Sequence, residues 1–231
     1  MCGRYTLATP DPFDVRARFP IGDSVEVRRR FNVAPGDEVL AVTTDKEGEP
    51  RGELLRWGLV PSWATAPDTG LKMINARVET VAERPAFKRA FERWRCLIPA
   101  DGFYEWQRAG GGPKRPFHIT DEHGALFAFA GLWSVWHAPH GGTLRSCTIL
   151  TTAANRAIAQ LHDRMPVILA PEYEAAWLDV SSPRDALDAV LAGLPAQRTV
   201  LTEVSTAVND ARCDSPDCLA PAGAGAQNSL F

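Results

Sequence analysis

The stretch RCLIPADGFYEW, residues 95–106, decides how the middle of the chain folds. Apolar and aromatic residues typical of β-strands stand on both sides of a turn-forming Asp-Gly pair. Successive side chains of a strand point to opposite faces, so Phe103 and Glu105 are expected on one face and Tyr104 on the other. The stretch therefore predicts strand structure that carries a carboxylate among aromatic side chains.

Segments on both sides of this stretch alternate between strand-like and helix-like patterns. Strands are predicted at residues 37–42, 52–57, 115–120, 125–136, 144–152 and 164–169. Helical spacing is found at residues 10–19, 84–94, 154–162, 171–179 and 183–193, and Pro85 suits a first helical turn. Residues 108–114 are typical of a hairpin tip. Without internal repeats, this mixture indicates one α+β domain over residues 1–218, followed by a disordered small and polar tail over 219–231.

The composition is that of an ordinary soluble globular protein. Of 231 residues, 45% are hydrophobic and 23% are charged, which is enough for a substantial core. No run of about 18 apolar residues is present for a membrane span, and no signal-peptide pattern is visible. The five cysteines are scattered and odd in number, at Cys2, Cys96, Cys147, Cys213 and Cys218. We therefore expect a cytoplasmic protein with reduced thiols, without membrane association, metal or cofactor.

The net charge of -3 argues against a general polyanion binder. Nonspecific nucleic-acid affinity requires clustered Lys and Arg side chains, so a nucleic-acid site would have to be local. Residues 28–30 and 84–95 are the candidate basic segments, and a solvated helix face explains the second equally well.

The chain begins MCGRYTL, and position 2 gives a cysteine a property that internal cysteines lack. Once Met1 is removed, Cys2 carries a free α-amine beside its thiol. The pKa of an α-amine is about 7.7–8.0, against about 10.4 for lysine, so far more of it is neutral near pH 7. A neutral amine attacks an aldehyde, and the thiol then closes a five-membered thiazolidine ring, with an effective molarity on the order of 10⁵ M.

Two other interpretations of Cys2 remain at this point. The same amine and thiol suit an N-terminal nucleophile that hydrolyses amides. Alternatively, Cys2 is an ordinary buried cysteine behind a retained Met1.

Glu105 and His162 are candidates for moving protons. A carboxylate among aromatic residues tends towards a raised pKa, which suits Glu105 to proton transfer near neutrality, although an exposed strand glutamate is the simpler interpretation. His162 lies between a helical pattern and an apolar strand in LHDRMPVIL, where a cap residue is as plausible as a catalyst. The remaining histidines are interpreted as incidental: His118, His123, His137 and His140.

Asn75 and Arg77 share one face of MINARVET if this segment is extended. An amide beside a guanidinium suits an oxygen-rich ligand such as phosphate, and an ion pair of Arg77 with Glu79 is the structural alternative. In WGLVPSWA, core packing explains Trp57 better, whereas Trp63 and the rigid turn at Pro35 suit contact with unpaired bases.

Six motifs taken together are more specific than any of these residues alone. MCGRY, RFNVAPG, WGLVPSWA, INARVET, RCLIPADGFYEW and LHDRMPVIL follow one another over residues 1–169. This series resembles the SOS response-associated peptidase (SRAP) family. The resemblance implies a single α+β domain with a mixed, barrel-like sheet core, and a protein of the DNA damage response that crosslinks to abasic sites in single-stranded DNA through Cys2.

The resemblance also implies roles for individual residues. Cys2 would be the crosslinking nucleophile, Asn75 would hold the N-terminus or the opened sugar, and Glu105 and His162 would manage protons. The DNA path would be lined by Arg4, Asn32, Pro35, Trp63, Arg77, Arg84 and Thr151. We expect a monomer that is nucleoid-associated when bound to DNA, with the replication machinery as a further candidate partner.

The expected reaction follows from the chemistry of the amine. It adds to the aldehyde of an opened abasic sugar, Glu105 or His162 transfers protons, and the thiolate closes the ring. Strand cleavage by β-elimination from the imine is the expected side reaction, and autoproteolytic removal of Met1 would expose the amine.

Two rival functions are weighed against this one. Class II glutamine amidotransferases also begin Met-Cys-Gly, but they typically use an Asn-Gly pair for the oxyanion, and this chain contains none. A noncatalytic single-strand binding module would bind DNA without forming an adduct.

Overall fold

Five strands close into a small mixed barrel that forms the centre of the molecule. The computed structural model describes residues 2–8, 11–23, 25–107, 114–191 and 194–223. The barrel strands are β3 (Glu38–Thr44), β4 (Pro50–Trp57), β6 (Arg95–Ala100), β9 (Phe127–His137) and β10 (Thr143–Ala153). They pair in the order β10-β4-β3-β6-β9 and back to β10, and within this ring only the β4–β10 pairing is parallel. The expected α+β class with a barrel-like core is confirmed.

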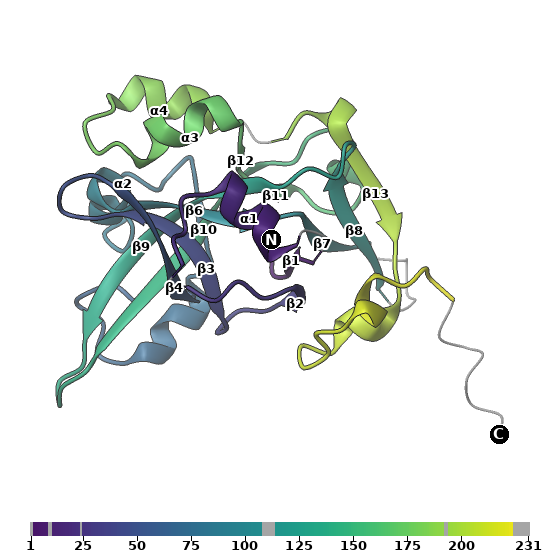
Figure 1. Ribbon diagram of the computed structural model, residues 1–231, viewed down its shortest axis with the longest axis horizontal. Helices are drawn as coiled ribbons and strands as arrows, with labels where there is room; N and C mark the ends of the chain where they lie inside the picture. Colours follow the sequence, from purple (N-terminus) through teal and green to yellow (C-terminus); the bar gives the residue numbers. More distant parts are fainter. Residues whose placement is uncertain (1, 9–10, 24, 108–113, 192–193, 224–231) are drawn as a thin grey trace.

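A second sheet lies against the barrel (Figure 1). Its order is β13 (Thr199–Glu203), β8 (Arg115–Asp121), β7 (Gly102–Gln107), β1 (Tyr5–Leu7) and β2 (Arg30–Val33). Strand β6 of the barrel leads through Asp101 directly into β7 of the second sheet. The stretch 95–106 therefore joins the two sheets, and β1 is an interior strand between β7 and β2.

Three short strands extend the barrel where the candidate site residues lie. β5 (Asn75–Arg77) runs parallel to β10, and β11 (Arg164–Pro166) runs antiparallel to it. β12 (Ile168–Leu169) pairs with β9, so the predicted strand over 164–169 is present in two parts.

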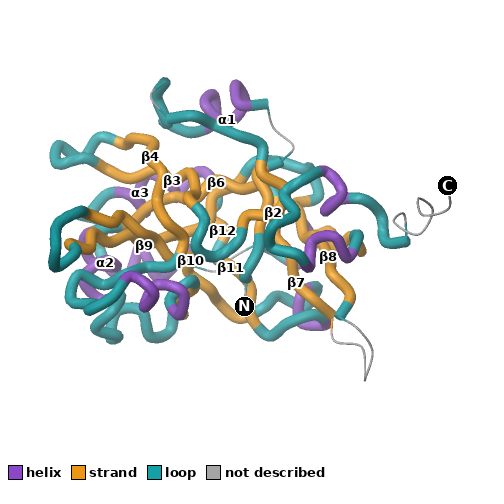
Figure 2. The backbone as a smooth tube through the Cα atoms, turned by 90° about the horizontal axis from the view of Figure 1, so that it is seen from below, coloured by secondary structure: helices purple, strands orange, loops and turns teal. Residues whose placement is uncertain are grey.

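In the described part of the chain, four α-helices cover the outside of the barrel. They are α1 (Pro12–Arg18), α2 (Lys88–Arg93), α3 (Pro171–Leu178) and α4 (Arg184–Val190). Their apolar side chains form one buried cluster with the outward-facing side chains of the barrel strands. Figure 1 shows α3 and α4 together above the barrel, and Figure 2 shows α1 and α2 on opposite sides of the strands. Short 3-10 helices occupy Pro67–Lys72, Ile158–Gln160, Ala196–Arg198, Thr206–Asn209 and Pro216–Leu219.

Two predicted helices differ from the structure. The helix expected over 84–94 begins only at Lys88, because residues 84–87 form a tighter turn in which Phe87 N–H donates to Arg84 O. The helix expected over 154–162 is reduced to one 3-10 turn. There the side chain of Asn155 accepts from two backbone N–H groups and donates to Leu194 O, which replaces regular helical hydrogen bonds.

The barrel interior follows the alternation expected for strands. In β3, Val39 and Ala41 belong to the interior cluster, whereas Leu40 and Val42 face the helices. The interior cluster continues through Tyr5 into the second sheet and also contains Cys2. The N-terminal segment is therefore part of the main core.

The expected hairpin tip and the expected C-terminal tail lie partly outside the described residues. Strands β7 and β8 pair as an antiparallel hairpin around the expected tip at 108–114, of which residues 108–113 are not described. At the C-terminal end, Ser205 N–H donates to Ala220 O, so contacts with the domain extend beyond residue 218, and residues 224–231 are not described. Within the described residues, no helix is long and apolar enough to cross a membrane.

Two neighbouring leucines of β4 test the barrel core. Leu55 is fully buried in the interior cluster, whereas Leu54 is 44% exposed. We expect Leu55→Ala to lower the free energy of unfolding by about 2–5 kcal/mol, because it leaves a cavity. Leu54→Ala should cost about 1 kcal/mol or less. Urea unfolding of both variants measures the difference, and equal costs would contradict the assignment of the interior face.

Candidate active site around Cys2

Cys2 lies just before β1, in the interior of the molecule. Its side chain is fully buried, its carbonyl oxygen accepts a hydrogen bond of 2.8 Å from Asn75 Nδ2, and its thiol lies 3.7 Å from Arg4 O. Burial raises the pKa of the Cys2 thiol, and the negative charge of Glu105 raises it further. The thiol therefore requires a nearby base before it can act as a thiolate nucleophile.

Asn75 is fixed by the barrel. It begins β5, which pairs with β10, and the indole N–H of Trp57 donates to the preceding carbonyl, Ile74 O, at 2.9 Å. The other side-chain atom of Asn75, Oδ1, is buried and accepts no hydrogen bond from the described residues. One end of the amide thus holds Cys2, and the other end remains available to a ligand hydroxyl or amine.

Glu105 is buried on β7, the strand beside β1. Its side chain is 3% exposed, so the interpretation as an exposed strand glutamate is wrong. Burial raises the pKa of Glu105, and the positive charges of the chain's amino terminus and of His162 partly oppose this rise. The raised pKa expected from the aromatic surroundings is confirmed. Glu105 and His162 are therefore close enough for their charges to interact.

His162 follows the 3-10 turn at Ile158–Gln160 and is partly exposed. Its Nδ1 accepts from the backbone N–H of Arg164 at 2.9 Å, which places the proton of the neutral ring on Nε2. When Nδ1 is protonated instead, Asp163 Oδ1 lies 2.8 Å away as a partner. Nδ1 of His162 therefore has two alternative partners, a backbone donor and a carboxylate acceptor.

A cavity of about 420 Å³ opens beside Asn75. Trp63 and Arg84, two predicted DNA contacts, line it together with Asn75. The remaining lining residues are Lys72, Met73, Pro85, Ala86 and Phe87. Trp57 is fully buried, as core packing predicts, whereas Trp63 is 61% exposed. This volume is in the range of small-molecule sites.

The loop that carries Trp63 is shaped by a close backbone approach. Gly58 has φ +126°, and a Cβ there would lie 2.8 Å from Gly70 O. Any other residue at position 58 would be strained and would push the two segments apart. The close approach holds the Trp63 loop next to the segment that leads into Asn75.

Arg77 is exposed on β5, two residues from Asn75. Glu79 forms its bidentate ion pair with Arg164, at 2.6 and 2.9 Å, and Arg77 adds only a weaker attraction that helps to lower the pKa of Glu79. Thr151 lies opposite Arg77 in the pairing of β5 with β10, but it is 1% exposed and its hydroxyl lies 3.4 Å from Ala76 O. In this structure Thr151 therefore supports the strands and does not line an open path.

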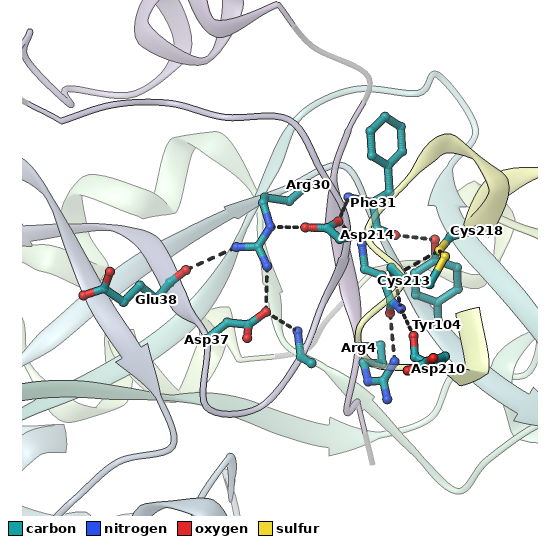
Figure 3. A network of polar contacts seen from close by, with 12 residues as sticks. Arg4, Arg30, Phe31, Asp37, Glu38, Tyr104, Asp210, Cys213, Asp214 and Cys218 are labelled. Atoms are coloured by element: carbon teal, nitrogen blue, oxygen red, sulfur yellow. Dashed lines mark hydrogen bonds and ion pairs between the residues drawn. The ribbon is translucent and has the colours of Figure 1, made fainter. Parts of the chain in front are cut away.

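Arg4 belongs to a polar network with the C-terminal segment (Figure 3), and Asn32 takes part in the same network. Arg4 Nη1 donates to Asn32 Oδ1 at 2.9 Å and to Val208 O at 3.0 Å. Asn32 is fully buried, and its amide donates to the carbonyls of Val208, Asp210 and Cys213. Asn32 thus holds the C-terminal segment and has no exposed surface for DNA. Pro35 is half-buried in the turn that follows β2.

The basic segment at residues 28–30 is largely neutralised. Arg30 pairs with both Asp37 and Asp214, and Arg28 pairs with Glu26. The segment therefore does not provide the local nucleic-acid site that its charge suggests.

Sequence reasoning overlooked three contributors. Lys72 lines the cavity, and its place three residues before Asn75 was the available signal. Arg164, which follows His162 in the LHDRMPVIL motif, forms an ion pair with Glu79 and donates a hydrogen bond to Thr151 O. His118 is not incidental, because it is half-buried against Tyr104, lies 3.0 Å from the Thr6 hydroxyl, and has its pKa lowered by desolvation to about 4.

The chain is similar to known proteins. The model of the family "SOS response associated peptidase (SRAP)" matches residues 1–211, and the chain belongs to this family. The Bacillus subtilis protein "Abasic site processing protein YoaM" is 43% identical over 95% of this chain and 97% of its own length. "Abasic site processing protein HMCES" of Xenopus tropicalis is 33% identical over 95% of this chain and 78% of its own.

Solved structures have the same fold. A protein of Bacteroides thetaiotaomicron superposes with a TM-score of 0.79 at 20% identity, covering 94% of this chain and 96% of that one. A Bordetella bronchiseptica protein superposes with a TM-score of 0.74 at 27% identity, covering 88% and 100%.

The burial of Glu105 predicts a pH dependence of stability. Because its pKa is raised on folding, the folded chain holds this proton more tightly, and stability from this group is lost as the pH rises above 4.5, the ordinary value. Glu105→Gln removes this loss. We therefore expect the free energy of unfolding of E105Q, relative to that of the parent chain, to increase as the pH rises. Urea unfolding over a pH series measures this difference.

Glu79 provides a control of opposite sign. Its hydrogen bond with Arg164 lowers its pKa, so its contribution is present above the ordinary value and is lost as the pH falls through the lowered one. E79Q should therefore be less stable than the parent chain near neutrality and approach it in acid. Parallel pH trends for E105Q and E79Q would contradict the electrostatic account of the site.

Proposed function

We propose that this chain recognises abasic sites in single-stranded DNA and forms a covalent thiazolidine crosslink to them through Cys2, after Met1 is removed. The observation that carries the proposal is the set of groups gathered at Cys2. Asn75 Nδ2 holds its carbonyl, and the charges of Glu105 and of the chain's amino terminus act on its thiol. Relatives from a bacterium and from a vertebrate are both named abasic site processing proteins, which supports this function for the chain.

The first step uses the amine. The opened deoxyribose of an abasic site presents an aldehyde, and the neutral amine of Cys2 adds to its carbon to give a carbinolamine. Loss of water then gives an imine. Proton transfer to the departing hydroxyl suits Glu105, because burial keeps its pKa raised and its carboxyl protonated at higher pH than usual.

The second step uses the thiol. The Cys2 thiol gives its proton to a base, and its sulfur adds to the imine carbon, which closes the thiazolidine ring. Ionised Glu105 and the ring of His162 are the bases that we assign to this step. Over both steps one water molecule leaves and no oxidant is needed. The buried Oδ1 of Asn75 is placed to accept a hydrogen bond from a hydroxyl of the opened sugar.

The cavity beside Asn75 supports a path for the strand. Trp63 offers an exposed aromatic face for an unpaired base, and the cations of Lys72, Arg84 and Arg77 suit the flanking phosphates. This is a local basic site in a chain whose net charge is -3.

Strand cleavage is the proposed side reaction. An imine acidifies the neighbouring C2′ hydrogen, so β-elimination competes whenever ring closure is slow. Removal of Met1 by the chain itself, with Cys2 as the nucleophile, is a further part of the proposal.

Variants at the N-terminus test the proposal directly. Inserting one alanine between Met1 and Cys2 moves the α-amine away from the thiol, so crosslinking to abasic single-stranded DNA on a denaturing gel should disappear. Cys2→Ser keeps the amine but removes ring closure, so cleavage of the strand should increase. Crosslinking by the insertion variant at the parent rate would overturn the proposal.

The exposed indole of Trp63 tests the path of the strand. Trp63→Ala should weaken binding of single-stranded DNA by about 1–3 kcal/mol, the usual contribution of one stacked base. Tyr173→Ala is the matched control, because Tyr173 is also an exposed aromatic but lines a different cavity. Fluorescence anisotropy measures both, and an equal effect of the two substitutions would exclude this path.

A further inference from the structure

The C-terminal segment packs across the second sheet, against β8, β7 and β2. The 3-10 helices at Thr206–Asn209 and Pro216–Leu219 lie against β8 and β2. In Figure 1 this segment is the yellow part beside β2. A small apolar cluster forms there from Tyr104, Val204, Val208 and Cys218, with Phe31, Trp106, Cys213 and Leu219 packed around it.

Two thiols of this segment lie next to each other. Cys213 Sγ and Cys218 Sγ are 3.4 Å apart, and the Cys218 thiol donates to Cys213 O at 3.3 Å (Figure 3). All five cysteines are among the described residues, and none forms a disulfide. The other three are fully buried and lie in the main core. The pair is therefore a separate dithiol, outside the site around Cys2.

We propose that Cys213 and Cys218 form a thiol–disulfide exchange site that reacts with small disulfides of the glutathione class. The thiolate of Cys213 attacks one sulfur of the small disulfide, which forms a mixed disulfide and releases one small thiol. The thiolate of Cys218 then attacks the Cys213 sulfur, which closes the intramolecular disulfide and releases the second small thiol. The protein loses two hydrogen atoms, and the small disulfide is reduced to two thiols.

The surroundings of the two sulfurs set the order of attack. Cys213 is half-buried and lies 3.6 Å from the Ser215 hydroxyl, whereas Cys218 is fully buried. Burial raises the pKa of Cys218 to about 11, so little of it is thiolate near neutrality. An external disulfide therefore meets Cys213 first, and closure by Cys218 is the slower step.

Closing the disulfide would fasten the segment to β2. The ring of residues 213–218 contains Asp214, whose carboxylate accepts from Phe31 N at 2.6 Å and from Asn32 N at 2.9 Å. Cys213 O also accepts from the Asn32 side chain at 2.7 Å. A covalent ring restricts the conformations in which this loop detaches, so these contacts should open less often when the pair is oxidised.

The experiment uses the full chain equilibrated with reduced and oxidised glutathione. Differential alkylation followed by peptide mass spectrometry reports the state of each cysteine. We expect an intramolecular Cys213–Cys218 disulfide while Cys96 and Cys147 remain reduced as buried internal references. In C218S the mixed disulfide with glutathione should accumulate on Cys213, and in C213S position 218 should stay unmodified.

Opposite results overturn the inference. The inference is wrong if Cys213 and Cys218 both stay reduced in a glutathione buffer that modifies them in the unfolded chain. It is also wrong if Cys218 is modified in preference to Cys213. Mapping of the cysteines in the unmutated chain tests the inference even if one variant folds poorly.

A second measurement is amide hydrogen exchange at Phe31 and Asn32, which should slow on oxidation. Unchanged exchange would show that the disulfide does not stabilise the contacts between the C-terminal segment and β2. Both readouts follow thiols and amides, so they are independent of the proposed crosslinking.

Discussion

The burial of β1 as an interior strand is the constraint on which the rest of the site depends. β1 has hydrogen-bonded neighbours on both sides, β7 and β2, so the N-terminal segment cannot shift without breaking two pairings. A buried polar network holds its far end, where Asp101 accepts from the Thr6 hydroxyl and from Ala8 N. Because the Thr6 hydroxyl donates to Asp101, the neutral ring of His118 donates to Thr6.

The same network explains the glycine in the Asp-Gly turn. A Cβ at Gly102 would lie 2.1 Å from His118 Nε2, so only glycine leaves room for the histidine. The stretch 95–106 therefore joins the barrel to the second sheet and also pairs with β1, the strand that Cys2 precedes. The same contacts therefore shape both the fold and the surroundings of Cys2, the proposed reactive residue.

The electrostatics of the site oppose stability. Glu105 and the Cys2 thiol are both buried, and both have raised pKa values because their ionised forms lose solvation there. Burying a carboxylate is costly unless positive groups compensate, and here the amino terminus and His162 do so only in part. Active sites often accept such a cost, because a group with a raised pKa can both give and take protons near neutrality. The proposed reaction requires this ability in each of its two steps.

Much of this arrangement could be predicted from the sequence, and the failures have physical reasons. The strands, the α+β class and the face of Glu105 follow from alternation, which is a local property. The contacts of Asn32 could not be predicted, because its amide binds carbonyls almost 180 residues later in the chain. Asn155 likewise ends a predicted helix through contacts with Leu194 and Thr199. The closeness of the two thiols at 213 and 218 depends on how two 3-10 turns pack, which spacing does not reveal.

The central claim is that the amine and thiol of Cys2 act together on one aldehyde. The intact mass of the protein after incubation with abasic single-stranded DNA tests this most directly. The account predicts a species whose mass equals the chain without Met1 plus the DNA, less one water molecule, stable without a chemical reductant. An adduct on a chain that retains Met1, or an adduct seen only after reductive trapping, would contradict it.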